Sequence, residues 1–149
     1  MARDQESGIT LRPASADDVH FVARVYGRAM GPVLRDAGLN LAQQGDLLLM
    51  QWSPAEIRII RAAGRDIGWV QVAAAPDALF IRNFCIDLSW QKLGIGAAVL
   101  RMLIAEASAR GDAVSLGVAK GNPARRLYER FGFRITHDDA QHDYMRRDS

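Results

Sequence analysis

The chain has 149 residues, of which 49% are apolar and 24% charged, as expected for a globular domain rather than a disordered segment. Its formal net charge of +2 is too small to predict a polyanionic partner, and its single cysteine, Cys85, excludes a disulfide framework. The polar start and the lack of a long apolar run argue against a signal peptide and a membrane helix. We therefore expect one domain over residues 1–149, cytoplasmic and without membrane or nucleic-acid partners.

The first third of the chain predicts a strand, a helix and a less regular connection. Residues 9–12 predict a short strand. Ser15 then begins a capping-box pattern, and apolar residues at helical spacing predict a helix over residues 16–30. A Gly-Pro pair at 31–32 should end that helix. Residues 33–52 predict one or two short helices with a loop.

Three strands are predicted in the middle of the chain, over residues 56–62, 67–74 and 78–87. Turn-forming residues at 64–66 and at 76–77 separate them. Because the connections are short, the three strands should form an antiparallel meander. The third strand is apolar on both faces, which favours a central position covered on both sides.

The pattern then changes to alternating helices and strands. In order, we predict a helix (94–110), a strand (113–118), a short helix (123–130) with Asn122 as its N-cap, and two final strands (133–136 and 144–146). A meander followed by β-α-β-α-β predicts an α/β domain with a mixed sheet and helices on both faces.

The turn that leads into the helix at 94–110 carries Gly94 and Gly96. Glycines let the backbone approach a ligand, and the free amides of a first helical turn favour a phosphate or diphosphate. A plain tight turn is the alternative, and these two glycines alone do not decide between them. Ala97 stands where a Walker A loop needs lysine, and the next strand ends without an acid, which disfavours nicotinamide binding.

The segment FCIDLSWQKLGIG, residues 84–96, resembles the acyl-CoA-binding motif of the GNAT superfamily of N-acyltransferases. Gln91, Gly94 and Gly96 match the three fixed positions of its Gln/Arg-x-x-Gly-x-Gly/Ala pattern. The segment NPARRLYERFGF, residues 122–133, is similar to a later helix of the same family. The resemblance implies a single GNAT-like domain, acetyl-CoA as cosubstrate, and transfer of an acetyl group to a primary amine by direct attack.

The resemblance also implies how the cosubstrate is held. The backbone of the strand around Cys85 would pair with the pantetheine arm as a further strand would, and the amides of residues 92–97 would hold the diphosphate. Asn122 is either a further contact or only a helix cap. The implied cofactor-binding residues are Phe84, Cys85, Ile86, Gln91, Lys92, Leu93, Gly94, Ile95, Gly96, Ala97 and Asn122.

Tyr128 corresponds to the general acid of the family. Its phenol, with an ordinary pKa near ~10, can protonate the leaving thiolate without itself being ionised at neutral pH. The alternative is a buried aromatic residue, because Leu127 and Phe131 flank it at core spacing. A backbone amide near Ile86 would polarise the thioester carbonyl.

The sequence predicts no general base. The strand at 78–86 carries no acid, and Asp87, Asp77 and Glu56 are only weak candidates. Nucleophilic catalysis by Cys85 is less favoured than direct transfer, because no motif places a histidine beside it.

Other functions and partners stay open. A CoA-binding regulatory module without catalysis is the main alternative, and a structural partner in a larger complex is a weaker one. The acceptor would be a small-molecule or peptide amine, and a homodimer is possible. No metal is expected, although His137 and His142 lie close in sequence.

Overall fold

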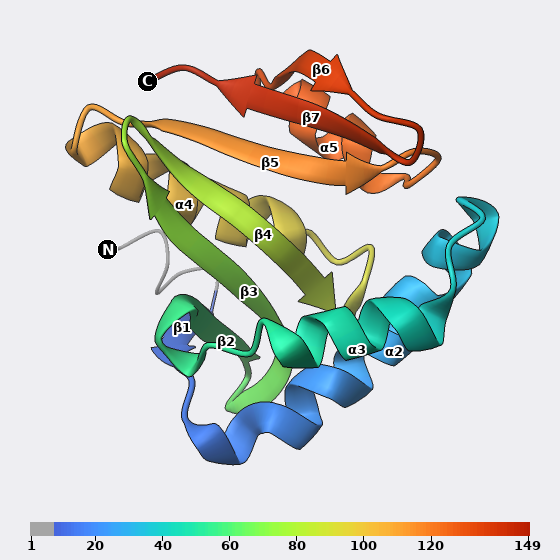
Figure 1. The fold of residues 1–149 in the computed structure, drawn as a ribbon. Helices are drawn as coiled ribbons and strands as arrows, with labels where there is room; N and C mark the ends of the chain where they lie inside the picture. Colours follow the sequence, from blue (N-terminus) through green and yellow to red (C-terminus); the bar gives the residue numbers. More distant parts are fainter. Residues whose placement is uncertain (1–7) are drawn as a thin grey trace.

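The computed structural model of the protein describes residues 8–149. Seven strands form one sheet in the order β1-β2-β3-β4-β5-β7-β6, shown in Figure 1. Only β4 and β5 pair in parallel, and the other neighbours are antiparallel. The predicted mixed sheet, antiparallel meander and β-α-β-α-β order are therefore confirmed.

The observed elements lie within a few residues of most predicted ones. The strands are β1 (Ile9–Pro13), β2 (Ile57–Ala62), β3 (Arg65–Ala75), β4 (Ala78–Ile86), β5 (Ala113–Ala119), β6 (Arg134–Asp138) and β7 (His142–Arg147). The α-helices are α2 (Val19–Asp36), α3 (Leu41–Met50), α4 (Ile95–Ala109) and α5 (Ala124–Arg130). Short 3-10 turns are η1 (Ala16–Asp18), η2 (Pro54–Glu56) and η3 (Leu88–Trp90). No helix in this part of the chain is long and apolar enough to cross a membrane.

Helices cover the sheet on both faces, as predicted. One buried cluster joins Leu100 and Leu103 of α4 to sheet residues such as Val70. A second cluster, on the α2 and α3 face, is centred on Trp69. Trp69 is fully buried, and its indole N–H donates to the Val22 carbonyl at 3.1 Å, so its polar atom is satisfied.

Helix α2 does not end at the Gly-Pro pair, and that prediction is wrong. Pro32 lies inside the helix, where it costs one backbone hydrogen bond. Gly31 and Leu34 are both buried in this stretch, and the apolar contacts of Leu34 with the second cluster offset that cost. The helix ends only before Gly38, which has a φ of +74°. Tertiary packing has overridden a local stop signal.

The segment between Gly38 and Trp52 folds into a loop and the single helix α3. Asn40 caps this helix, since its Oδ1 accepts a hydrogen bond from the Gln43 amide at 3.0 Å. The capping box predicted at the start of the first helix is also present, with the Ser15 amide donating to Asp18 at 2.8 Å.

Candidate functional site

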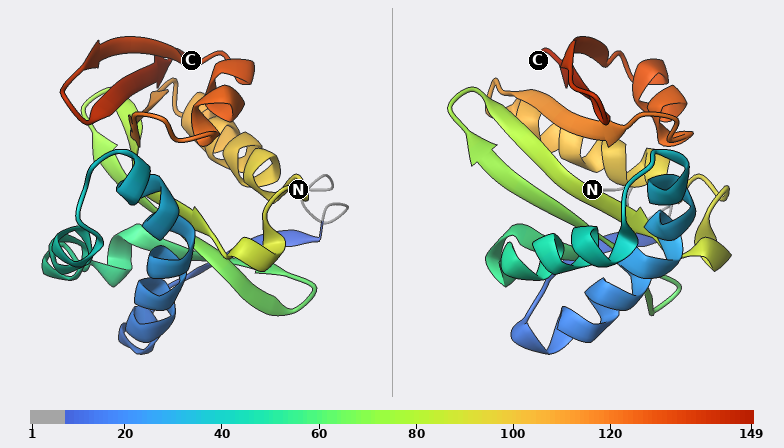
Figure 2. Two further views of the ribbon diagram at one scale, coloured as in Figure 1. Left: turned by 90° about the vertical axis from the view of Figure 1, so that its right-hand side faces the viewer. Right: turned by 45° about the vertical axis from the view of Figure 1, so that its right-hand side comes forward.

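Strands β4 and β5 separate halfway along their length. They pair only where Ala78–Ile81 lies beside Ala113–Leu116. Beyond that point β5 continues along β7, while β4 stays paired with β3 as far as Ile86. Figures 1 and 2 show the two strands diverging. A strand edge that has lost its neighbour presents amides and carbonyls to whatever enters the gap.

A β-bulge at Arg82 sets which side chains of β4 face the gap. In the register with β3, Ile81 lies opposite Val72 and Asn83 opposite Gln71, so Arg82 is an extra residue. The bulge reverses the alternation of faces. Ile81 and Phe84 therefore pack toward α4, whereas Cys85 belongs to the cluster on the α2 face.

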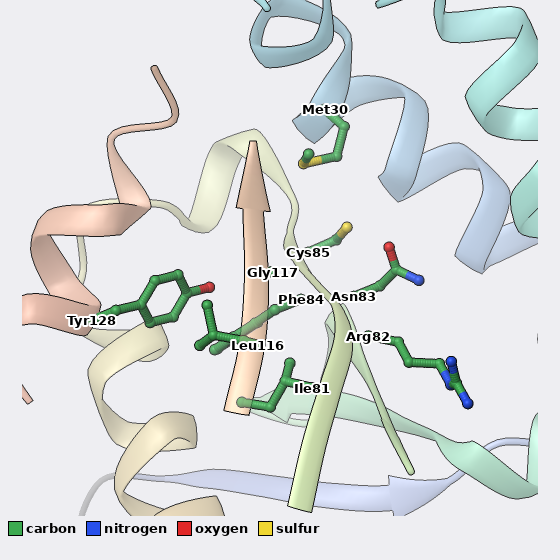
Figure 3. A pocket seen from close by; sticks show the side chains of 9 residues that line it. All are labelled: Met30, Ile81, Arg82, Asn83, Phe84, Cys85, Leu116, Gly117 and Tyr128. Carbon is green, nitrogen blue, oxygen red and sulfur yellow. The ribbon is translucent and has the colours of Figure 1, made fainter. Parts of the chain in front are cut away.

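A pocket of about 60 Å³ lies where the two strands part. Figure 3 shows Tyr128 of α5 entering it from one side and Met30 of α2 from the other. Its lining consists of Met30, Ile81, Arg82, Asn83, Phe84, Cys85, Leu116, Gly117 and Tyr128. The strand separation thus brings together side chains from four elements.

Tyr128 is the aromatic residue of this pocket with a polar end. Its side chain is 7% exposed, and its ring packs on Phe133 with centroids 5.8 Å apart. Within residues 8–149 the phenol oxygen has no hydrogen-bond partner, and Figure 3 shows it pointing toward the gap. Burial raises the pKa of Tyr128, mainly by desolvation, so the phenol stays protonated at neutral pH.

The glycine turn lies between β4 and α4. Gln91 fastens it to the strand, because its Nε2 donates to the Ile86 carbonyl at 2.9 Å. Lys92 and Gly94 both have left-handed backbones, with φ of +64° and +81°. The Ala98 amide bonds to the Gly94 carbonyl at 3.1 Å and so closes the first turn of α4.

The backbone amides of the residues just before Ala98 have no hydrogen-bond partner in this turn. Among the described residues, none of the amides of residues 92–97 donates to a backbone carbonyl. A run of free amides at the N-terminus of a helix is an anion-binding arrangement, because the helix dipole adds to it. The Leu93 side chain is 64% exposed, while Ile95 is buried and anchors the helix start.

The other residues predicted to bind the cofactor, Gly96, Ala97 and Asn122, lie at or just before the starts of two helices. Gly96 lies against α5, where an added Cβ would be 3.4 Å from Leu127, and Ala97 follows it in the first turn of α4. Asn122 accepts a hydrogen bond from the Ala124 amide at 2.9 Å, but the N-cap of α5 is Pro123. The predicted N-cap position of Asn122 is therefore wrong by one residue, because the helix begins at Ala124 rather than at Pro123. The structure brings Phe84 and Cys85 together with Tyr128, whereas Asn122 is outside the pocket lining.

Cys85 lines the pocket as a buried thiol. Its side chain is 2% exposed, and burial raises the pKa of the thiol to about 12. Because the thiolate is the reactive form, the neutral thiol is a poor nucleophile. This favours direct transfer over nucleophilic catalysis by Cys85, as the sequence analysis did.

The three acids considered as bases lie outside the pocket lining. Asp87 accepts from Arg28 Nε at 2.7 Å and from the Leu88 amide at 2.9 Å. Asp77 is in the turn before β4, the end far from the pocket, where it pairs with Arg146 at 3.0 Å. Glu56 precedes β2 and pairs with Arg82 at 3.3 Å.

The histidine pair sits on the β6–β7 hairpin. The His137 ring stacks on Tyr144, with centroids 4.5 Å apart, and the Tyr144 hydroxyl donates to Asp139 at 2.9 Å. Across residues 8–149, no group of three or more His, Cys, Asp or Glu side chains is arranged to hold a metal ion.

Sequence reasoning missed several residues that line the pocket. Asn83 carried a signal, since it and Arg82 are the two polar residues in an otherwise apolar strand. Met30 and Gly117 carried none, because they reach the pocket from elements distant in the chain. Gly117 also receives the Tyr144 ring, which an added Cβ would meet at 3.0 Å.

Comparisons with known proteins agree with this architecture. A family model described as an acetyltransferase (GNAT) domain matches residues 53–135, which include the turn and all of β4. No curated protein matches the sequence.

Solved structures of the same fold cover nearly the whole chain. PaiA N-acetyltransferase from Thermoplasma acidophilum, in complex with coenzyme A, has a TM-score of 0.77 at 15% identity, over 95% of this chain and 99% of that one. The ribosomal-protein-S18-alanine N-acetyltransferase from Escherichia coli has a TM-score of 0.68 at 20% identity, over 93% and 90%. Ard1 from Thermoplasma volcanium has a TM-score of 0.66 at 22% identity, over 95% and 97%.

Proposed function

The chain belongs to the GNAT acetyltransferase family, and we propose that it transfers an acetyl group from acetyl-CoA to a primary amine within a ternary complex. The observation that carries this proposal is the placement of the Tyr128 phenol in the gap between β4 and β5, with the free amides of residues 92–97 at the adjacent helix start. The coenzyme A bound to the T. acidophilum neighbour supports the choice of cosubstrate.

The turn at the start of α4 fits a diphosphate. Lys92 and Gly94 have left-handed backbones, the amides of residues 92–97 have no backbone carbonyl partner, and the helix dipole adds partial positive charge. Gln91 keeps the turn attached to the end of β4. A ligand held here by its diphosphate would extend an arm toward the unpaired edge of β4.

That edge fits the pantetheine arm. Pantetheine contains two amide groups, and residues 82–86 of β4 have lost the neighbour that would have satisfied their outward-facing backbone groups. Hydrogen bonds from Phe84, Cys85 and Ile86 to those amides would continue the sheet by strand addition. The thioester at the tip of the arm would then lie in the pocket with Tyr128.

Direct transfer there needs only a neutral amine and a proton donor. The nitrogen lone pair forms the new C–N bond, and the C–S bond breaks. The sulfur takes the phenolic proton of Tyr128, the nitrogen releases one proton, and the phenol recovers a proton from solvent. The products are an amide and a thiol, so atoms and charge balance. A backbone amide near Ile86 is the proposed donor to the carbonyl oxygen.

A second candidate is a CoA-binding module without catalysis. It is favoured by the pocket lining, whose nine residues include no carboxylate that could act as a base. The unpaired phenol of Tyr128 favours the enzyme, because a binding module has no use for a buried proton donor.

The test combines titration with turnover. Coenzyme A is titrated calorimetrically into the protein, and release of free thiol from acetyl-CoA is then followed with L-alaninamide, butylamine and an alanine-led tetrapeptide as acceptors. Binding together with amine-dependent thiol release supports the enzyme. Binding without release across the three amines supports the module, and no binding refutes both.

A further inference from the structure

Two side chains, Asn83 and Gln71, connect the pocket by hydrogen bonds to the carboxylate of Glu56 outside it. Gln71 lies directly across from Asn83 in the β3–β4 register and is only 1% exposed. Its Nε2 donates to Glu56 Oε1 at 3.0 Å, and its Oε1 accepts from Asn83 Nδ2 at 3.0 Å. Both ends of this buried amide are therefore satisfied, as its burial requires.

The Glu56 carboxylate determines which group donates in both hydrogen bonds, from Gln71 to Glu56 and from Asn83 to Gln71. An ionised carboxylate can only accept hydrogen bonds, so Gln71 must turn its NH₂ group toward Glu56. Its oxygen then faces Asn83, which must in turn present its own NH₂ group to Gln71. Asn83 thus has one permitted orientation, with Oδ1 directed away from Gln71.

In the hydrogen-bonded row Glu56–Gln71–Asn83, the Oδ1 atom of Asn83 is the acceptor that a ligand could use. Within the described chain, no hydrogen bond uses Asn83 Oδ1, and Asn83 lines the pocket together with Cys85 and Tyr128. Figure 3 shows Asn83 on the side of β4 opposite Tyr128, near Met30 of α2. An oriented acceptor and an unpaired phenol therefore lie on opposite sides of β4, and both residues line the same pocket.

We propose that Asn83 is the residue that receives the acceptor amine, its Oδ1 accepting a hydrogen bond from an N–H of the neutral primary amine. This assignment rests on the proposed function. An amine held by one N–H directs its lone pair elsewhere, which an attack on the thioester carbon requires. Gln71 and Glu56 act through Asn83 and are positioning residues.

An amide side chain can orient the amine but cannot remove its proton. A neutral Asn oxygen accepts a hydrogen bond but takes no proton, so the chain from Asn83 to Glu56 is not a proton relay. It also attracts an ammonium ion less than a carboxylate would, because hydrogen bonds to a charged acceptor are about twice as strong. Asn83 is therefore suited to an amine that arrives as the free base.

The experiment measures KM for L-alaninamide and for acetyl-CoA in Asn83→Leu, which has a side chain of similar size without an acceptor. We expect KM for the amine to rise roughly tenfold, the equivalent of one hydrogen bond, while KM for acetyl-CoA changes less than twofold. The affinity for coenzyme A, measured by calorimetry without amine, is the internal control and reports whether the variant keeps the folded site.

Glu56→Gln provides the second variant. Glu56 is partly exposed, and glutamine keeps its size, but it can donate as well as accept and so frees Gln71 to flip. We expect KM for the amine to rise about threefold, as expected when an acceptor is no longer held in one orientation. Because glutamine at position 56 also weakens the ion pair with Arg82 of the pocket lining, this rise supports the assignment only together with the result for Asn83→Leu.

Two outcomes overturn the assignment. An unchanged amine KM in Asn83→Leu, or in Glu56→Gln if the first variant does not fold, refutes the role of Asn83 and leaves the proposed function standing. A wild-type protein that binds coenzyme A but acetylates none of the three amines refutes the enzyme, and the role of Asn83 with it.

Discussion

The backbone of Gly68 lies so close to that of Cys85 that a Cβ on Gly68 would meet the Cys85 carbonyl oxygen at 2.4 Å. Real Cβ atoms do not approach a carbonyl oxygen to that distance, so the strand pair would have to shift. The contact joins β3 to the segment of β4 that lines the pocket. Gly68 therefore helps to hold the site strand in its present register.

Gly68→Ala should lower the free energy of unfolding by about 1–3 kcal/mol, the usual cost of overpacking. Denaturant unfolding measures the change. Gly27→Ala is the matched control, since Gly27 lies inside α2 with nothing within 4 Å of an added Cβ. That control should stabilise the protein by about 0.5–1 kcal/mol. Equal effects in the two variants would contradict the close contact.

Tyr128→Phe should reduce kcat by about 10²–10⁴-fold if the phenol is the general acid. Calorimetry should give an unchanged affinity for coenzyme A, because the hydroxyl makes no other contact. Tyr144→Phe serves as the control, since it removes a hydroxyl that bonds only to Asp139. A Tyr128→Phe enzyme with full kcat would remove the general-acid role.

The pH profile gives a further check on Tyr128. Its folded-state pKa is raised by burial, so the phenol keeps its proton through neutral pH and past the ordinary value near ~10. Activity should therefore show no loss from tyrosine ionisation between about pH 7 and pH 10. A decline in kcat centred well below pH 10 would mean that another group supplies the proton.

Gly94→Ala should weaken coenzyme A binding by roughly tenfold. Its φ of +81° costs an alanine about 1–2 kcal/mol, and relief of that strain would turn the amides of the α4 start away from a common ligand. Gly38→Ala is the control, because its φ is +74° and its added Cβ also meets nothing within 4 Å. It should lose similar stability and keep its affinity, and a loss of affinity in both variants would point to general destabilisation.

Cys85 should resist alkylation in the folded protein. Burial raises its pKa to about 12, so the thiol remains neutral from pH 7 to pH 9, and Cys85 is packed inside the second buried cluster together with Trp69. Iodoacetamide should label it much more slowly in buffer than in denaturant, with mass spectrometry as the readout. Rapid labelling of the native protein at pH 7 would indicate an accessible thiolate and reopen covalent catalysis.

The amine preference should follow the pKa of the acceptor. Because none of the pocket-lining residues is a carboxylate, the amine must already be neutral. At pH 7.5 roughly a third of α-amino groups are neutral, compared with about one in a thousand lysine-type amines. L-Alaninamide should therefore give a higher kcat/KM than butylamine, and kcat/KM for butylamine should rise with pH. Equal values at neutral pH would reveal a general base.

Local patterns identified most of the elements around the site. The meander, the glycine turn and helix α4 follow from turn residues and apolar period, which act over a few neighbouring residues. Tyr128 was singled out by the motif resemblance, since its spacing alone favoured a buried aromatic residue. The prediction that the first helix ends at Pro32 was wrong. The Gly-Pro pair acts locally, whereas the helix is continued by packing of Leu34 in the second buried cluster, whose members come from distant parts of the chain.

The sequence by itself determined the order of strands and helices along the chain and placed the glycine turn beside the end of a central strand, because both depend on residues adjacent in the chain. Only the tertiary structure decided the bulge at Arg82, the parting of β4 from β5, and the fixed direction of Asn83. These depend on how strands far apart in sequence pair, and a shift of one residue in that register would turn Asn83 to the other face.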